Sequence, residues 1–397
     1  MDRVIKFNIA FAILQFVMDL FFVISWTKFV RKRNLNKSLY IILWLASAIA
    51  AIILCYSLYI KFSHIIPSYS EKILILIINI WFIPKLFISP VIIFKDLIKI
   101  IRKKFKNRTS TVKLKEANPI DLKRRQLVEN IGWCMSGVPF ILLTDGYFKT
   151  TKNYKIYEIE IPLQWLPPEL DGIKIVQISD IHAASLYSSR DFLRARFLAN
   201  SLEPDIMVVT GDFINDNIQE IYIIKEELSK LRAKYGVFAC PGNHEHYLNS
   251  DVTSILYKEI ESAGIKMLIN ENITFNIKGE KLQLAGVDNT GKSMYFADFD
   301  AAMKGLSPAY PTILLCHDPS NWEPSIVGKT FAGLTLAGHT HGGQIGLELF
   351  GEMLTPTRVQ YKQYAGLYHS KGQYLYVNRG IGTTGPPIRV GIKPEIT

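Results

Sequence analysis

Five short segments of the chain carry histidine, aspartate or asparagine side chains that could bind metal ions or move protons. Each follows a run of apolar residues with the length and β-branched content of a buried strand. Because the carboxyl ends of strands in open α/β sheets gather at one crevice, residues far apart in sequence can converge there. The segments are SDIH, TGD, PGNHE, CHDP and AGHTHGG, and they supply Asp180, His182, Asp212, Asn243, His244, His317, His339 and His341.

The donor atoms in this set indicate the class of metal. Carboxylate oxygen, amide oxygen and imidazole nitrogen suit divalent Mn, Fe or Zn, and the absence of a thiolate from the set argues against a structural zinc site. Two such ions about 3.5–4 Å apart can hold the attacking and leaving oxygens of a phosphoryl displacement and lower the pKa of bound water toward about 7. We therefore predict a dinuclear centre at which metal-bound hydroxide attacks phosphorus. Asp212 is the expected bridge, since it follows Gly211, where another backbone can approach closely.

The glycine-rich segment AGHTHGG explains how one stretch of chain could serve both ions. His339 and His341 are two residues apart, so on an extended segment their side chains point to the same side. The flanking glycines allow the backbone to come near the metals.

Alternating strand and helix patterns must position these residues. They begin after about residue 152 and are typical of an α/β fold with buried strands. We expect strands at 172–179, 205–210, 236–240, 281–287, 312–317, 333–338 and 373–378, and helices at 191–200, 222–231 and 252–263.

The N-terminal part of the chain has a different character. Three apolar runs, 7–30, 39–60 and 73–94, each have about the 20 residues that a bilayer-spanning helix needs, and Pro84 and Pro90 break the third. A fourth run, 131–143, is shorter. We predict a membrane region with three to four transmembrane helices and basic loops over residues 1–150, and a catalytic domain over 151–397. Asp19 lies inside the first run, where an acid costs about 2.5–3.5 kcal/mol, so we expect it to face other helices or to sit off-centre.

The positive charge of the protein belongs to the membrane region. The formal net charge is +11, and residues 1–150 hold 23 Lys and Arg against 8 Asp and Glu. The remaining residues hold 23 against 27, which argues against a nucleic-acid partner, since a binding domain would carry the excess itself. The basic residues cluster at 28–37 and 95–125, and the positive-inside rule places both loops in the cytoplasm.

The side of the membrane that the catalytic domain occupies depends on the fourth run. If it spans, the domain lies on the periplasmic or extracytoplasmic side of the cell inner membrane; if it lies in the interface, the domain is cytoplasmic. The preceding KRRQLVEN is similar to a twin-arginine export signal, which favours the outer side. An ordinary basic anchor beside a membrane segment explains it equally well.

The ordered motif set resembles the calcineurin-like metallophosphoesterase family, in its membrane-associated bacterial phosphodiesterase branch. The motifs cover about residues 170–345, and the lead-in 166–172, the LAGV before Asp288 and the tail RGIGTTGPPIRVGIKPEI also fit that branch. The resemblance implies a four-layer α/β/β/α sandwich, and it implies His244 as general acid or phosphate contact. It also implies two metal ions bridged by Asp212. The first is held by Asp180, His182 and His341, and the second is held by Asn243, His317 and His339.

Two functions from different classes are consistent with these features. A third class, transport, is disfavoured because the apolar runs contain few polar residues besides Asp19 that could form a pathway. The first is a membrane-tethered phosphodiesterase or pyrophosphohydrolase whose partners are the bilayer and a phosphoester, with lipid-linked substrates included. Relatives cleave UDP-2,3-diacylglucosamine or envelope phosphodiesters; a cytoplasmic domain favours the former and an exported domain the latter. The second is a non-catalytic membrane protein with a structural metal site. We expect the substrate to meet Asp288, Asn289, loop 346–364, Arg379 and Arg389, of which the two arginines could equally be surface salt-bridge partners.

Overall fold

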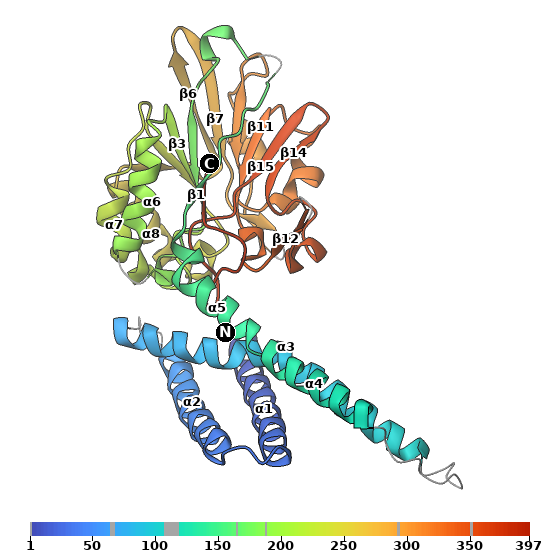
Figure 1. Cartoon of the computed structure of the whole chain (residues 1–397). Helices are drawn as coiled ribbons and strands as arrows, with labels where there is room; N and C mark the ends of the chain where they lie inside the picture. The colour runs from blue at the N-terminus through green and yellow to red at the C-terminus, as the bar shows by residue number, and fades with distance from the viewer. Residues whose placement is uncertain are drawn as a thin grey trace. The chain divides into compact units, whose positions relative to one another are not determined.

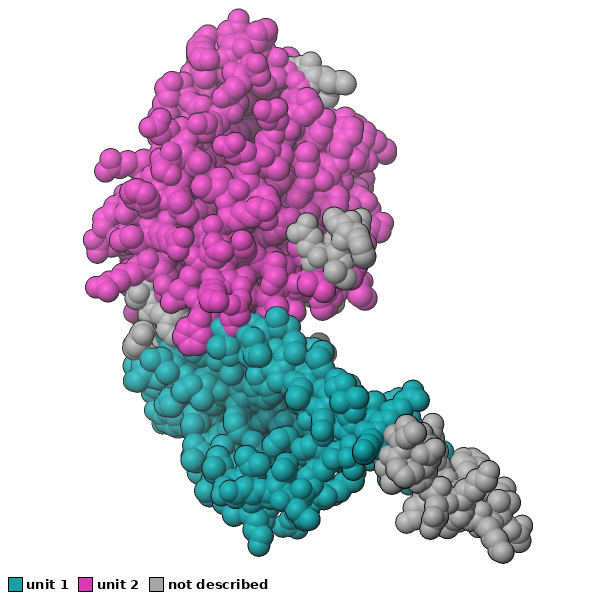
Figure 2. Space-filling model, viewed as in Figure 1, with its two compact units in different colours: residues 1–144 teal, residues 145–397 magenta. Residues whose placement is uncertain are grey.

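The computed structural model describes residues 2–63, 68–106, 119–163, 166–186, 189–291, 294–349 and 352–397. The chain divides into two compact units, Met1–Thr144 and Asp145–Thr397, which are coloured separately in Figure 2. Each is described below by itself.

The N-terminal unit is helical. Within the described residues, four segments are long and apolar enough to cross a membrane: Asn8–Lys32, Ser38–Ile60, Ser70–Ile101 and Gln126–Lys152. The prediction of a membrane region is thus confirmed, with the fourth segment longer than the sequence indicated. The helices are α1 (Asp2–Lys32), α2 (Ser38–Phe62), α3 (Tyr69–Lys106), α4 (Pro119–Met135) and α5 (Val138–Phe148).

Helix α3 is continuous through the two prolines that were expected to break it. Pro84 and Pro90 both lie inside the helix. Proline is tolerated in transmembrane helices because neighbouring helices and hydroxyl side chains can satisfy the backbone groups it frees. Ser89, next to Pro90, donates a hydrogen bond of 2.7 Å to the carbonyl of Met18 in α1 and so joins the two helices.

Asp19 faces other helices, as predicted. It is fully buried and pairs with Lys85 of α3, which the sequence analysis did not single out. The Ser47 hydroxyl of α2 donates to the same carboxylate. The Lys85 ammonium also lies 3.4 Å from the centre of the Trp81 ring. A polar cluster built from α1, α2 and α3 therefore lies inside the first unit.

The second unit contains two main sheets (Figure 1). The first has the order β2–β3–β4–β5 and is parallel throughout, as expected of strands separated by helices. Helices α6, α7 and α8 contribute to one buried cluster with its strands. The ranges are β2 (Ile175–Ile178), α6 (Ser189–Ser201), β3 (Ile206–Thr210), α7 (Ile221–Leu228), β4 (Val237–Cys240), α8 (Ser250–Ser262) and β5 (Ile265–Met267).

The second sheet has the order β14–β15–β11–β10–β7–β6. Its four inner strands are parallel, and both edge strands pair antiparallel to their neighbours. Side chains of both sheets meet in one buried cluster that includes Val208, Phe238, Leu284 and Leu315. The ranges are β6 (Glu271–Ile277), β7 (Glu280–Gly286), β10 (Thr312–Leu315), β11 (Leu334–Ala337), β14 (Gly366–Ser370) and β15 (Gln373–Val377).

The α/β class is confirmed, and each strand and helix predicted for this unit is present with slightly different ends. Strands β5, β6 and β14 were not predicted. Two of them, β6 and β14, are half-exposed edge strands without a continuous apolar run. Close to the chain end, β16 (Glu395–Ile396) pairs with β1 (Lys155–Ile156).

Candidate metal centre

Five strand ends bring the eight predicted side chains together. Three of the strands, β2, β3 and β4, belong to the first sheet, and β10 and β11 belong to the second. The site therefore lies where the carboxyl ends of both sheets meet. The strands are followed by Asp180 and His182, by Asp212, by Asn243 and His244, by His317, and by His339 and His341.

One group of possible ligands consists of Asp180, His182 and His341. All three are buried, and their donor atoms lie within 4.8 Å of one another. The Nε2 atoms of His182 and His341 are 3.1 Å apart, and His341 Nε2 is 3.4 Å from Asp180 Oδ1.

A second group consists of Asp212, His317 and His339. His317 Nε2 lies 3.2 Å from Asp212 Oδ2, while its Nδ1 is 2.6 Å from the carbonyl of Thr210. That bond orients the ring so that Nε2 faces the site. Asn243 joins this group, because its Oδ1 is 2.7 Å from His339 Nδ1.

Asp212 lies close to histidines of both groups of possible ligands. Its Oδ2 is 3.2 Å from His317 Nε2 and 3.5 Å from His182 Nε2. A further cluster joins Asp212 and His182 to His244. The central position of Asp212 is the one that a bridging carboxylate would need.

The residues fit divalent cations. His182 Nδ1 is buried and has no hydrogen-bond partner among the described residues, and the buried His317 Nε2 makes no well-aligned hydrogen bond although it lies 3.2 Å from Asp212 Oδ2. Buried polar atoms are normally satisfied, so such atoms in a cluster of carboxylates and imidazoles call for a bound partner. Imidazole nitrogens and carboxylate oxygens are ligands of Zn, Fe and Mn.

Burial favours the neutral form, which binds a metal, at three of the histidines, and it lowers the pKa of His339 as well as those of His182 and His341. Burial lowers the pKa of His182 to about 3 and that of His341 well below its usual value. Burial also opposes the charge on His317, but the Asp212 carboxylate outweighs it and raises the pKa of His317 to about 10. Burial raises the pKa of Asp180 to about 6. His317 and His244 outweigh burial at Asp212 and hold its pKa well below the usual range.

The backbone at the site is unusual. Asp180, His182, Asp212, His339 and His341 all have positive φ, between 45° and 71°. Side chains other than glycine rarely adopt this conformation, and each instance costs on the order of 1–3 kcal/mol. The glycine that precedes His339 has a steric role: a Cβ on Gly338 would lie 2.3 Å from Asp180 Oδ2.

Glu245, the last residue of the PGNHE motif, supports the site, a role that the motif alone did not indicate. It is fully buried and accepts hydrogen bonds from the N–H groups of Asp212, Phe213 and Gly242 at 3.1, 2.8 and 2.7 Å. It thereby fixes the two loops that carry Asp212 and Asn243. The sequence signal for Glu245 was its place inside this motif, directly after His244.

His244 is held from two sides. Its Nδ1 lies 2.5 Å from the carbonyl of Asn215, and its N–H donates to Asp212 Oδ1 at 3.0 Å. The ring packs edge-on against His182, with centroids 4.6 Å apart. With Nδ1 engaged by a carbonyl, Nε2 is the ring nitrogen free to meet a ligand.

A cavity of about 320 Å³ opens over the centre. Asp212, Asn243, His244, His339 and His341 contribute to its lining, as do Tyr247 and Tyr361. The Tyr361 hydroxyl is 2.8 Å from His339 Nε2. Loop 346–364, expected at the substrate, contributes Thr357, Gln360 and Tyr361.

Three residues predicted to bind substrate lie elsewhere, outside the described lining of this cavity. Asp288 pairs with His246 at 2.7 Å, and Asn289 is buried. Arg389 is fully buried rather than at the surface, and its guanidinium donates to the carbonyls of Arg379, Gly380 and Gly382. It also lies 3.4 Å from His341 Nδ1. Arg389 therefore lies next to the ligand candidate His341 without lining the cavity over the centre. Arg379, also expected at the substrate, forms an ion pair with Glu395.

Comparison with known proteins identifies the family of both parts of the chain. Residues 173–343 match the model of the calcineurin-like phosphoesterase family, and residues 3–151 match that of a probable calcineurin-like phosphoesterase transmembrane domain. The uncharacterized metallophosphoesterase YkuE of Bacillus subtilis is 34% identical over 262 residues, which cover 64% of this chain and 87% of YkuE. A Bos taurus transmembrane protein with metallophosphoesterase domain is 32% identical over 276 residues. That match covers 66% of this chain but only 60% of the bovine protein.

The fold and the site define a membrane-associated, metal-dependent phosphoesterase. The chain belongs to the calcineurin-like phosphoesterase family.

Proposed function

We propose that the protein is a membrane-tethered hydrolase of phosphodiesters or pyrophosphates with two metal ions in its site. The observation that carries the proposal is the shared position of Asp212 between two groups of buried donors. Asp180, His182 and His341 would hold one ion, and Asn243, His317 and His339 would hold the other. Mn, Fe or Zn suits these donors, and the bound ions would supply an activated water and polarise the phosphoryl oxygens.

His244 is the proposed proton donor to the leaving group. The carbonyl of Asn215 engages Nδ1, so Nε2 would carry the proton toward the leaving oxygen. This role is also the reason to prefer an enzyme over a protein with a purely structural metal site, since His244 is not needed to complete either ligand set.

The charge of the site suits an anionic substrate. Asp180 and Asp212 are the two carboxylates of the proposed set, and Asn243 contributes a neutral amide, so two divalent ions would leave a net positive charge. Tyr247 and Tyr361 also line the cavity, and their rings could pack against an apolar or ring-bearing leaving group. Membrane attachment favours a lipid-linked phosphoester as the natural substrate.

We propose that the catalytic domain lies on the extracytoplasmic side. Support comes from combining four spans with cytoplasmic basic loops at 28–37 and 95–125, because the chain then leaves the membrane on the outer side after the fourth span. Labelling of single cysteines introduced beyond Lys152 by a membrane-impermeant reagent in intact cells tests this. Labelling only after lysis would place the domain in the cytoplasm.

The central experiment measures metal content and turnover on the full-length chain. Purified protein should bind close to two equivalents of metal and hydrolyse bis-p-nitrophenyl phosphate. Asp212→Asn should lose both properties, with activity reduced by at least 100-fold. Asp251→Asn is the matched control, since Asp251 is an exposed carboxylate in the first turn of α8. Metal binding without hydrolysis of any phosphodiester or pyrophosphate would leave a structural metal site as the function.

A further inference from the structure

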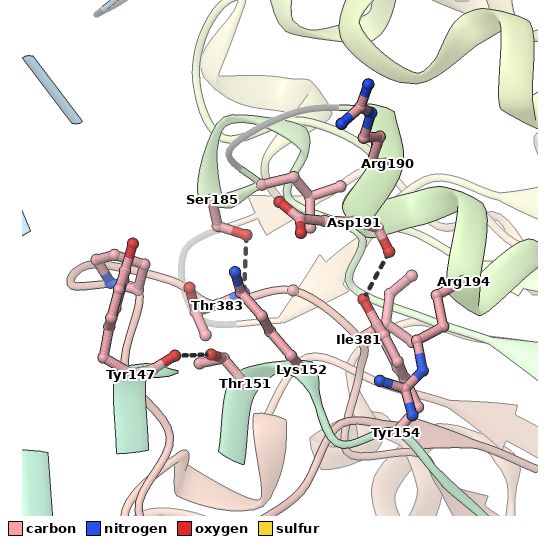
Figure 3. A pocket seen from close by; sticks show the side chains of 13 residues that line it. Tyr147, Thr151, Lys152, Tyr154, Ser185, Arg190, Asp191, Arg194, Ile381 and Thr383 are labelled. Carbon is pink, nitrogen blue, oxygen red and sulfur yellow. Dashed lines mark hydrogen bonds between the residues drawn. The ribbon is translucent and has the colours of Figure 1, made fainter. Parts of the chain in front are cut away.

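A second cavity in the same unit lies apart from the lining of the metal centre (Figure 3). It has a volume of about 120 Å³. Its lining residues come from three parts of the chain: the end of the fourth candidate span with Tyr154, Ser185 and Leu186 with the first turns of α6, and the segment 381–383 with Pro387. We propose that this cavity binds the phosphate of an anionic phospholipid, as a lipid site separate from catalysis.

The first support is charge. Lys152, Arg190 and Arg194 line the cavity and are exposed, against a single carboxylate, Asp191. In Figure 3 the Lys152 side chain extends toward Ser185 and Thr383. Arginine is suited to phosphate because its planar guanidinium can donate two parallel hydrogen bonds. The positive charge at the cavity therefore favours a phosphate-bearing ligand with a net negative charge over a zwitterionic or neutral ligand.

The second support is an unsatisfied hydroxyl. Thr383 lines the cavity and is 3% exposed, yet its Oγ1 has no hydrogen-bond partner among the described residues. Its N–H is used, since it donates to Ser185 Oγ at 3.1 Å. A buried hydroxyl without a partner is costly, and a ligand oxygen inside the cavity would satisfy it.

The third support is the position of the cavity along the chain. Tyr147, Thr151 and Lys152 line it, and all three belong to the candidate span Gln126–Lys152. Whether this segment spans the bilayer or rests in the interface, its end would lie at the lipid headgroups. Lipid phosphates are concentrated in that layer, and basic residues near an anionic surface gain about 1 kcal/mol each.

The walls also suit the rest of a lipid. Tyr147, Leu186, Ile381 and Pro387 add apolar surface to the lining of the cavity. Glycerol carbons and the first methylenes of an acyl chain could pack there, whereas free phosphate would leave this surface uncovered. A lining with both apolar surface and cations thus favours a phospholipid over a soluble anion.

The lipid site and the metal centre share a segment of backbone. Thr383 lines the lipid cavity, and its neighbour Thr384 lines the cavity over the metals. Thr384 exchanges hydrogen bonds with Gln344, at 2.7 and 2.9 Å. Ser185, which holds Thr383, is three residues after His182. A lipid bound at Thr383 would therefore order a segment that reaches both sites.

The test is a titration of the full-length chain in neutral detergent, read by native mass spectrometry. The probes are short-chain phosphatidylglycerol, short-chain phosphatidylcholine, glycerol 3-phosphate and inorganic phosphate. We expect one tight phosphatidylglycerol site that is at least tenfold weaker for phosphatidylcholine, and no competition from either soluble phosphate at millimolar concentration. Competition by a soluble phosphate would overturn the lipid assignment in favour of a free anion. Equal binding of the two lipids would overturn the role of headgroup charge.

Two variants locate the binding. Arg190→Gln combined with Arg194→Gln should weaken phosphatidylglycerol at least tenfold. The control, Arg232→Gln with Lys258→Gln, removes the same charge from exposed positions outside the cavity and should change nothing. Thr383→Val keeps the shape of the side chain and should weaken binding about fivefold, the loss expected for about 1 kcal/mol of hydrogen bonding. Equal affinity in the wild type and in Thr383→Val, with the arginine variant matching its control, would refute the site.

Discussion

The carboxylate of Glu245 accepts a hydrogen bond from the backbone N–H of Asp212 at 3.1 Å, and neither group is accessible to solvent. The same carboxylate accepts from Gly242, whose neighbour is Asn243. One buried acid thus holds the loop with the proposed bridging ligand and the loop with the amide ligand at a constant separation. Metal affinity should depend on Glu245 although the residue is not a ligand.

Glu245→Gln tests this dependence. A glutamine offers one acceptor oxygen and turns an NH₂ group toward backbone donors, so at least one buried N–H is left unpaired. We expect a loss of about 1–3 kcal/mol in unfolding free energy and a metal affinity about 10–100-fold lower, the usual effect of removing an outer-shell partner. Calorimetric metal titration and chemical unfolding measure the two quantities.

Glu227→Gln is the control for Glu245→Gln. Glu227 is also a buried carboxylate of this unit, but it pairs with Arg196 and Lys230 away from the centre. Its replacement should lower stability and leave metal affinity unchanged. A metal affinity equal to wild type in Glu245→Gln would show that the loops keep their positions without this carboxylate.

His244→Ala should separate catalysis from metal binding. If His244 donates a proton, kcat should fall by about 10²–10⁴-fold while metal content stays near two equivalents. Metal content by elemental analysis and steady-state hydrolysis of bis-p-nitrophenyl phosphate check both. His246→Ala is the matched control, because His246 pairs with Asp288 and stacks on Phe296 rather than lining the cavity. Loss of a metal equivalent from His244→Ala would instead make His244 a ligand, as its cluster with His182 and Asp212 allows.

The buried Asp19–Lys85 pair should control the stability of the helical unit. Asp19→Asn leaves the Lys85 ammonium without its counter-charge and should cost about 3–5 kcal/mol, as breaking a buried ion pair does. Replacing both, as Asp19→Leu with Lys85→Met, should recover most of the loss. Thermal unfolding of the full-length chain in detergent, followed by the accessibility of introduced cysteines in α2, measures the effect.

An exposed pair in the same chain provides the comparison. Glu323 and Lys362 lie 3.2 Å apart outside the candidate spans with both side chains exposed, so Glu323→Gln should cost less than about 1 kcal/mol. If Asp19→Asn were as mild as Glu323→Gln, the intramembrane pair would contribute no more than a surface contact.

Removal of metal should loosen the second unit selectively. Ions present at about 100 times their Kd stabilise a folded domain by about 2.7 kcal/mol, and this contribution disappears on chelation. Hydrogen exchange should therefore accelerate around residues 179–183, 211–213 and 338–343 when EDTA is added. Helices α1 and α2 serve as the internal reference and should exchange at unchanged rates. Uniform acceleration along the chain would indicate loss of the whole fold rather than of the site.

The positions of the metal-site residues were predictable because the signal is local. Each short apolar run reads as a buried strand, and the polar residue directly after it must lie at the strand end. Asp180, Asp212 and His317 all follow this rule. Their division into two groups followed from family resemblance, because the relative position of two strand ends is not encoded near either of them.

Other features could not be read from the sequence for the same reason. Lys85 lies in an apolar run beside a proline, and only the packing of α1 on α3 shows that it meets Asp19. Arg389 resembles an exposed phosphate-binding residue until the carbonyls that surround it are known. The role of Glu245 can be recognised only when the positions of the two loops that it joins are known. In each case the partner is more than 30 residues away or belongs to a segment of irregular backbone.

Five of the proposed ligands hold their backbone in the left-handed region, where glycine alone is free of strain. Glycine at His339, for example, would relax a backbone whose φ is 71°, so the metal-free domain should gain stability as it loses its chemistry. In a library of variants of this protein that is screened for thermal stability alone in the presence of a chelator, glycine should therefore become enriched at these positions. Selection for stability alone would remove the metal centre without any change in the substrate. The left-handed backbone at these ligands therefore lowers the stability of the domain in exchange for metal binding.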